Sequence, residues 1–242
     1  MSKKIRAHHS LFFLGLLAVG FCRSPDSYTS MGFAYLNQGK PSHALYFFNK
    51  ALQQQSDHSL ALYGKGILLS ENPITYPLAK SCLEKALAKE LGEKERLLAY
   101  EKLILMALRE GKAQEALEFY RKAMEQKVSS PNFFLLAAKI PPSENFHPLM
   151  ALEKGLQLYP AEAELHLQYV EVSGFYKSPQ LKARYLQQLY EGGVKNEKIL
   201  LRAAYYYYIS NNKEKAWELL LREGTKFSPY VKLLEEGLFS PP

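Results

Sequence analysis

Histidine, cysteine and carboxylate side chains are the groups of this chain that could bind a metal ion or transfer a proton. Outside the first 22 residues, the histidines are His43, His58, His147 and His166. A zinc-type site needs several such ligands at short spacings, for example two histidines four residues apart on a helix. The four histidines are scattered and show no such spacing. We therefore expect no metal site, and we expect each histidine at the surface or in a turn.

The pair Gly64-x-Gly66 is a fragment of a glycine-rich phosphate-binding loop. Such a loop follows a β-strand and opens a helix, whereas these two glycines lie inside a segment that is predicted to be helical. We interpret both as positions where helices pack closely. Because no nucleophile motif is present either, the sequence predicts a protein that is not an enzyme, with no cofactor and no small-molecule substrate.

The first 22 residues have the composition of an export signal. Lys3, Lys4 and Arg6 form a basic start, and the apolar stretch Leu11 to Phe21 follows. This stretch is much shorter than the ~20 residues that a membrane-spanning helix needs. We therefore expect residues 1–22 to be a signal peptide.

The cysteine that ends this segment has two interpretations. Val19-Gly20-Phe21-Cys22 resembles a bacterial lipobox, which implies that Cys22 becomes the lipid-modified first residue of a membrane-anchored lipoprotein, although Phe21 departs from the usual small residue. The alternative is ordinary cleavage after Ala18-Val19-Gly20, which has small residues at both key positions. We favour lipidation, because a cysteine at this place has no structural role.

The charge of the chain does not indicate a nucleic-acid partner. The formal net charge of +7 falls to +4 when the three basic residues of the signal peptide are removed. Lysine and glutamate are interspersed, as in Glu93-Lys94-Glu95-Arg96, and no basic stripe is present. Mixed charges of this kind are typical of solvated helix faces, so we expect no binding to nucleic acid.

The rest of the chain repeats a pattern of small and aromatic residues at helical spacing. The pattern starts with Gly32-x-x-Tyr35 and Ala44-x-x-x-Phe48-x-x-Ala51. Its second part recurs at Ala79, Leu83 and Ala86, at Ala116, Tyr120 and Ala123, and at Ala216 and Leu220. The first intervals, 35 and 37 residues, are close to the ~34-residue period of an array of helical hairpins. We expect Gly32 and Ala44 to lie where paired helices approach most closely.

Seven residues of the first repeat match the tetratricopeptide repeat pattern: Tyr28, Met31, Gly32, Tyr35, Ala44, Phe48 and Ala51. The chain thus resembles this family, which implies an all-α fold: a right-handed α-solenoid of about six antiparallel helix-turn-helix repeats with a short C-terminal capping helix. Residues 23–242 would form this domain. The expected repeats span about 25–58, 59–94, 95–128, 129–160, 161–194 and 195–229, and the cap spans 230–238.

The resemblance is weaker in the middle of the chain. Pro141-Pro142 interrupts the first helix of the fourth repeat, and Pro148 stands where the family prefers alanine. The fifth repeat has helical periodicity but few signature residues. The register of both repeats therefore stays open.

In this family, certain positions on the first helix of each repeat face a concave groove. Carried over to this chain, they imply a partner-binding surface made of Phe33, Asn37, Tyr63, Ile67, Leu105, Arg109, Phe133, Tyr205 and Tyr208. A contiguous apolar and aromatic strip is typical of a docking site. The alternative is that these side chains pack on one another or on the C-terminal segment. Relatives that bind C-terminal carboxylates use lysine and asparagine where Thr29 and Phe33 stand here, so we do not expect that mode.

Tyr205 to Tyr208 form a run of four tyrosines. Four consecutive helical residues sweep about 300°, so the four rings cannot all enter the core. Tyr207 matches a packing position of the repeat, and Tyr205 and Tyr208 are expected to face the groove. The other interpretation is that all four connect the fifth and sixth repeats with the cap.

These features predict a non-catalytic scaffold of the bacterial cell envelope that binds a peptide or protein partner in its groove. Anchoring to a membrane through Cys22 is favoured, and a soluble periplasmic or secreted binding module is the alternative if cleavage follows Gly20. Lipoproteins of similar architecture act in the assembly of outer-membrane proteins and of pili, which is an analogy at the level of the fold.

Overall fold

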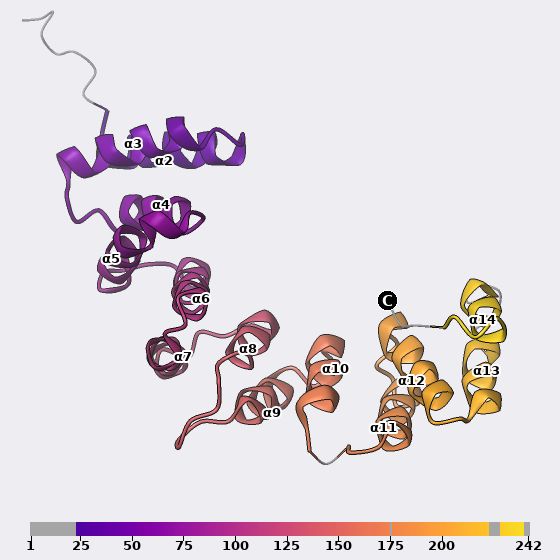
Figure 1. The fold of residues 1–242 in the computed structure, drawn as a ribbon. Helices are drawn as coiled ribbons and strands as arrows, with labels where there is room; N and C mark the ends of the chain where they lie inside the picture. Colours follow the sequence, from indigo (N-terminus) through magenta and orange to yellow (C-terminus); the bar gives the residue numbers. More distant parts are fainter. Residues whose placement is uncertain (1–22, 175, 223–227, 240–242) are drawn as a thin grey trace, which may run out of the picture. The chain divides into compact units, whose positions relative to one another are not determined.

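The structure is a computed structural model that describes residues 23–174, 176–222 and 228–239 (Figure 1). Within these ranges, all the regular secondary structure is helical, which confirms the expected all-α fold. None of the described helices combines the length and the apolar character needed to cross a membrane. The expected signal peptide and Cys22 lie outside the described residues.

The chain divides into two compact units, and the first is Met1–Lys102. Its elements are α2 (Pro25–Asn37), α3 (Pro41–Gln54), α4 (Ser59–Leu69), the short 3-10 helix η1 (Pro73–Thr75), α5 (Tyr76–Leu87) and the first part of α6 (Glu93–Arg109). Helix α2 begins at a capping residue: Ser24 Oγ accepts a hydrogen bond from the backbone N–H of Ser27 at 3.2 Å, and Pro25 opens the helix. Gly39 has a φ of 68°, a value that glycine adopts without strain, and the chain then turns directly into α3.

Phe48 is the centre of the packing between the first two helical pairs. Its ring is fully buried and lies against glycines of both first helices, Gly32 on α2 and Gly64 on α4. A Cβ atom would lie 2.5 Å from Phe48 Cε1 at Gly32 and 2.4 Å from Phe48 Cζ at Gly64. Likewise, a Cβ atom at Gly66 would lie 2.7 Å from the Leu83 side chain. The interpretation of Gly64 and Gly66 as packing residues is therefore confirmed.

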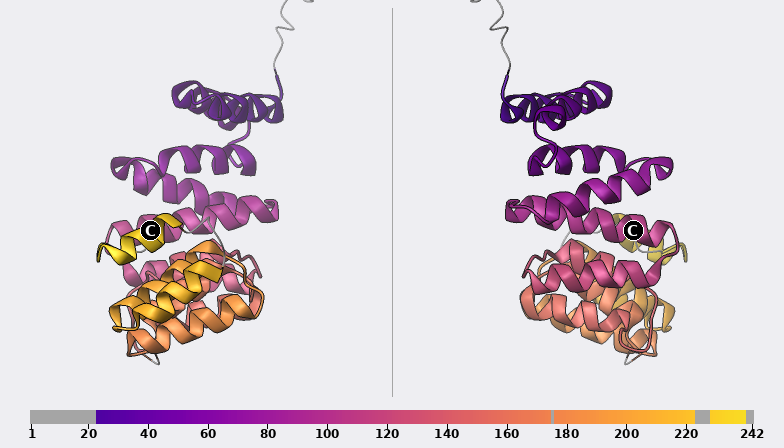
Figure 2. Two further views of the ribbon diagram at one scale, coloured as in Figure 1. Left: turned by 90° about the vertical axis from the view of Figure 1, so that its right-hand side faces the viewer. Right: turned by 90° about the vertical axis from the view of Figure 1, so that its left-hand side faces the viewer.

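The second unit, Leu103–Pro242, begins with the last part of α6. Its further helices are α7 (Ala113–Glu125), α8 (Pro131–Ala137), α9 (Pro148–Leu158), α10 (Ala163–Val172), α11 (Pro179–Glu191), α12 (Glu197–Ile209), α13 (Lys213–Arg222) and α14 (Ser228–Glu235). Figure 2 shows the C-terminal helices of this unit, in orange and yellow, packed in layers. Over the described residues, six helical pairs followed by α14 agree with the expected six repeats and cap. The domain boundaries 23–242 stay a prediction.

Prolines set the register of the fourth pair. Helix α8 ends at Ala137, before Pro141, and Pro148 is the first residue of α9. The fourth residue of α9 is the fully buried Ala151, and a fully buried alanine is also the fourth residue of α3, α5, α7 and α13. The expectation that Pro148 replaces this alanine was therefore wrong. The proline instead starts the helix, because its fixed φ suits the first turn and its missing N–H is not needed there.

Candidate functional site

The structure distributes the nine expected partner-binding residues over both units. Phe33, Asn37, Tyr63 and Ile67 belong to the first unit, and Leu105, Arg109, Phe133, Tyr205 and Tyr208 belong to the second. Only Asn37 and Arg109 are exposed. Tyr63 and Phe133 are buried, and the other five are half-buried. Their role in partner binding stays a prediction, but their surroundings differ in ways that matter for it.

In the first unit, Phe33 and Tyr63 pack on each other. Their ring centroids lie 6.2 Å apart, and Phe33 also meets the edge of Phe48 at 5.1 Å. Burial raises the pKa of Tyr63 to about 12, with a smaller contribution from the charge of Glu95, so the phenol is neutral at physiological pH. The contact between these two rings joins α2 to α4. Of the four expected partner-binding residues in this unit, Asn37 is the exposed one.

In the second unit, a residue of the C-terminal segment covers Tyr205 and Tyr208. The ring of Phe239 is 4% exposed, with its centroid 6.3 Å from that of Tyr205 and 6.0 Å from that of Tyr208. The hydroxyl of Tyr206 donates to Glu171 on α10, and that of Tyr207 donates to Gln187 on α11 at 2.8 Å. Each of the four tyrosines thus has a packing or hydrogen-bonding partner. These contacts favour the interpretation that the run joins the last repeats and the cap.

Phe133 lies in the core of the second unit. Its side chain is fully buried, and its ring stacks on Tyr120 with centroids 5.4 Å apart and meets Phe134 at 5.5 Å. The neighbouring Asn132 is exposed. Successive helical residues point about 100° apart. A shift of one residue in the assigned repeat position therefore selects the buried Phe133 in place of the exposed Asn132.

A polar groove lies along the first helices of the last three pairs, α8, α10 and α12. It is a pocket of about 410 Å3 lined by Asn132, Leu135, Lys139, Glu164, Leu167, Gln168, Glu171, Lys198 and Arg202. Seven of these nine side chains are polar or charged, whereas the sequence led us to expect an apolar surface. We call these nine residues the polar groove.

The sequence holds a signal for the polar groove that the family positions missed. Its residues recur every three or four positions, at 164, 168 and 171 on α10 and at 198 and 202 on α12. This spacing places them on one face of each helix. A polar stripe on one helix is ordinary, however, and it becomes a groove only when three such helices lie next to one another.

The carboxylates of the polar groove are paired with cations. Glu164 forms an ion pair with Lys198. Glu171 accepts hydrogen bonds from Tyr206 and from Lys182, the latter at 3.0 Å, and lies 3.5 Å from Arg202. Partial burial acts to raise the pKa of Glu171, but the hydrogen bonds from Tyr206 and Lys182 and the two positive charges outweigh it and lower the pKa. Glu171 is therefore a carboxylate at neutral pH and cross-links three helices.

Three polar side chains of the groove remain available to a ligand. Within the part of the chain that the structure describes, no hydrogen bond or ion pair engages the side chains of Asn132, Lys139 and Gln168. All three are exposed. Asparagine and glutamine amides both donate and accept hydrogen bonds, and lysine donates three. This set can bind the backbone N–H and C=O groups of a peptide and one negative charge.

A smaller apolar pocket adjoins the polar groove at Lys139. It has a volume of about 280 Å3 and is lined by Leu105, Leu108, Arg109, Gly111, Ala113, Lys139 and Pro141. Two of the expected partner-binding residues, Leu105 and Arg109, therefore do line a pocket. We call it the Leu105 pocket.

The buried histidines have structural roles. His166 Nε2 lies 2.8 Å from the carbonyl oxygen of Pro160, to which it must donate, and Nδ1 accepts from the Tyr185 hydroxyl at 2.7 Å. His166 is 8% exposed on α10, so its expected place at the surface or in a turn was wrong. His58 caps α4 and is bonded to Asp26 at 2.9 Å. Among the described residues, no three His, Cys, Asp or Glu side chains gather in a way that could hold a metal ion.

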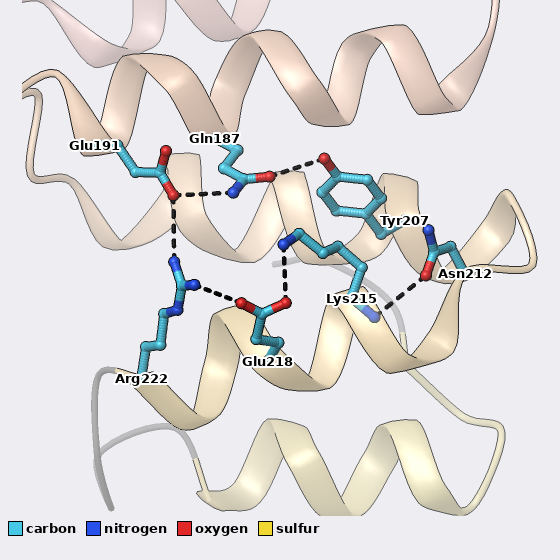
Figure 3. A network of polar contacts seen from close by, with 7 residues as sticks. All are labelled: Gln187, Glu191, Tyr207, Asn212, Lys215, Glu218 and Arg222. Atoms are coloured by element: carbon cyan, nitrogen blue, oxygen red, sulfur yellow. Dashed lines mark hydrogen bonds and ion pairs between the residues drawn. The ribbon is translucent and has the colours of Figure 1, made fainter.

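A second polar cluster joins α11, α12 and α13 (Figure 3). Its members are Gln187, Glu191, Tyr207, Asn212, Lys215, Glu218 and Arg222. Arg222 bonds both Glu218 and Glu191, the latter at 3.4 Å, and Lys215 donates to Glu218 at 2.8 Å. Both cations are paired inside the cluster, and exposed pairs of this kind contribute about 0–1 kcal/mol each. We assign this cluster to the packing of the helices and not to a binding site.

No protein-family model matches this sequence, and no curated protein matches it. Several solved structures do match this chain. PilF of Pseudomonas aeruginosa is 17% identical, with a TM-score of 0.57, and the match covers 88% of this chain and 96% of PilF. YrrB, described as a TPR protein with an unusual peptide-binding site, is 19% identical over 87% of this chain and 89% of its own, with a TM-score of 0.36.

The TPR domain of P58(IPK) is a further match, 16% identical over 88% of this chain and 64% of its own, with a TM-score of 0.37. The likeness to PilF concerns the fold, because the sequence identity is low. Together with the six helical pairs, it shows that the chain has the helical solenoid fold of tetratricopeptide-repeat proteins.

Proposed function

We propose that this chain, having the tetratricopeptide-repeat fold, is a non-catalytic scaffold that binds a peptide segment of a protein partner in the polar groove. The observation that carries the proposal is a set of three unengaged polar side chains: Asn132 on α8, Gln168 on α10 and Lys139 just after α8. The groove volume of about 410 Å3 lies within the range of ~300–1,000 Å3 that is usual for ligand pockets.

The chemistry of the groove suits a peptide better than a compact apolar ligand. Each residue of an extended peptide presents one N–H donor and one C=O acceptor. The amides of Asn132 and Gln168 can satisfy both, and the ion pairs around Glu164 and Glu171 hold the walls in place. Leu135 and Leu167 add apolar surface between these polar groups.

Site-specific photo-crosslinking tests this proposal. A photoreactive amino acid at position 168, in the groove, should form a covalent adduct with a partner protein in cells that contain the chain naturally. Gln157 on α9 is the matched control, since it is also an exposed glutamine but does not line the groove. Adducts of equal yield from positions 168 and 157, or from 157 alone, would contradict a binding role for the groove.

We further propose that the chain is exported and anchored to a membrane of the cell envelope through a lipid on Cys22. The support is the sequence of the first 22 residues, with its basic start, short apolar stretch and lipobox-like end. The acyl chains added at such a cysteine anchor a protein more firmly than one chain alone. A soluble periplasmic or secreted form, cleaved after Gly20, is the alternative.

Mass spectrometry of the mature protein separates these two forms. We expect the first residue to be Cys22 carrying a diacylglyceryl group, and we expect Cys22→Ser to shift the protein from the membrane to the soluble fraction. Phe21 at the mature N-terminus, with an unmodified cysteine after it, would establish the soluble form instead.

A further inference from the structure

We infer that the peptide segment carries an aliphatic side chain and an aspartate or glutamate two residues apart, with the aliphatic side chain in the Leu105 pocket and the carboxylate on Lys139. This inference rests on the proposed binding function and names the chemistry of the partner. It follows from the walls of the Leu105 pocket, from the distribution of charge and from the position of Lys139.

Most of the residues that line the Leu105 pocket are apolar. Leu105 and Leu108 come from the last turns of α6, Ala113 opens α7, and Pro141 follows α8. Gly111, with a φ of 72°, makes the tight turn between α6 and α7 that forms one side of the pocket. A volume of about 280 Å3 with these walls is suited to one aliphatic side chain, whose transfer from water would stabilise the complex.

The charged residues that line the Leu105 pocket are both cations. Arg109 and Lys139 belong to its lining, and the lining contains no aspartate or glutamate. In the adjoining polar groove, both carboxylates are already paired, Glu164 with Lys198 and Glu171 with Lys182 and Arg202. Among the described residues, Lys139 has no carboxylate partner. A negatively charged ligand group is therefore attracted to Lys139 in particular.

Lys139 lines both pockets, so a peptide that occupies the Leu105 pocket and the polar groove together has contacts with Lys139 within reach. In an extended chain, side chains two residues apart point to the same side. An aliphatic residue that enters the Leu105 pocket thus directs the side chain two positions along toward the same face. A carboxylate at that position can reach the flexible lysine.

Calorimetric titration of the full chain with blocked peptides tests the inference. The probe is a ten-residue Ser/Gly peptide, acetylated and amidated at its ends, that contains Leu-Gly-Asp once, so that aspartate is its one carboxylate. Replacing Asp by Asn should weaken binding about threefold to fivefold, as expected for an exposed ion pair. Replacing Leu by Gly should weaken binding about tenfold or more, because the aliphatic contact is lost.

Charge reversal makes the test specific. Lys139→Glu should weaken binding of the Asp peptide about tenfold, because attraction is replaced by repulsion, and a peptide with Lys in place of Asp should bind this variant better than it binds the unmodified chain. Lys154→Glu is the matched control: Lys154 is an exposed lysine on α9 that lines neither pocket, and its replacement should change affinity less than twofold. Circular dichroism verifies that both variants are folded.

Three results would overturn the inference: no detectable binding at millimolar peptide, binding that is indifferent to the Leu and Asp replacements, or equal effects of the two lysine variants. The proposed function can still hold in each case, because a partner that crosslinks at position 168 but not at 157 would show that the groove binds a segment of different chemistry.

Discussion

Replacing Phe48 with alanine should lower the free energy of unfolding of the first unit by about 3–5 kcal/mol. The ring is fully buried, and it is enclosed by two glycines, Gly32 and Gly64, and by the ring of Phe33. Glycines have no side chain that could move into the space, so the cavity left by the substitution stays largely empty. Such a loss is a large part of the 5–15 kcal/mol that stabilises a typical domain.

Urea unfolding of the full chain, followed by circular dichroism, measures this effect. Tyr46→Ala is the control, because Tyr46 is an aromatic residue of the same helix but is 56% exposed. It contacts only Phe47 and Lys50 among the ring interactions of the described residues, and we expect its replacement to cost less than about 1 kcal/mol. Equal losses for the two variants would show that Phe48 is not the centre of the packing.

Replacing Phe133 with alanine should lower the stability of the second unit by about 3–5 kcal/mol. Phe133 was expected from the family positions to contact a partner, but it is fully buried between Tyr120 and Phe134. The substitution should therefore act through folding. Unfolding curves should show a transition that begins at lower urea, and binding should be lost only to the extent that the unit unfolds.

Asn132→Ala is the matched control for Phe133→Ala. Asn132 precedes Phe133 and is an exposed residue of the polar groove. Its replacement should change stability by no more than about 0.5 kcal/mol while it reduces crosslinking from position 168. The opposite pattern would show that Phe133 contacts the partner: the Phe133→Ala variant would be stable but would no longer bind, and the Asn132→Ala variant would bind normally.

The architecture could be predicted from the sequence because the contacts of a repeat array are mostly between near neighbours. Ala44, Phe48 and Ala51 lie on α3, which contacts its chain neighbours α2 and α4, and all three are fully buried. A small residue at such a place is a steric requirement, since a Cβ atom at Gly32 or Gly64 would overlap the Phe48 ring. These requirements recur with the repeat and are visible in the sequence.

The binding surface could be predicted only in part. Leu105 and Arg109 line a pocket, but the sequence left open whether Tyr205 and Tyr208 face a groove or pack on the C-terminal segment, and it did not single out Phe239 as the residue that covers them. That contact joins residues more than 30 positions apart, and no repeated spacing accompanies it. The polar groove was missed for a different reason, since exposed polar residues such as Gln168 are usual on any solvated helix.

Outside the fourth and fifth repeats, the sequence of this protein by itself determined the helices, their pairing and the small residues at which they approach, because each depends on side chains within one repeat and its neighbour. Tertiary structure alone decided which side chains are accessible. One residue turns a helical side chain by about 100°, which separates the buried Phe133 from the exposed Asn132. The stacking of α8, α10 and α12 then combines three ordinary polar stripes into one groove, with Lys139 at its junction with the apolar Leu105 pocket.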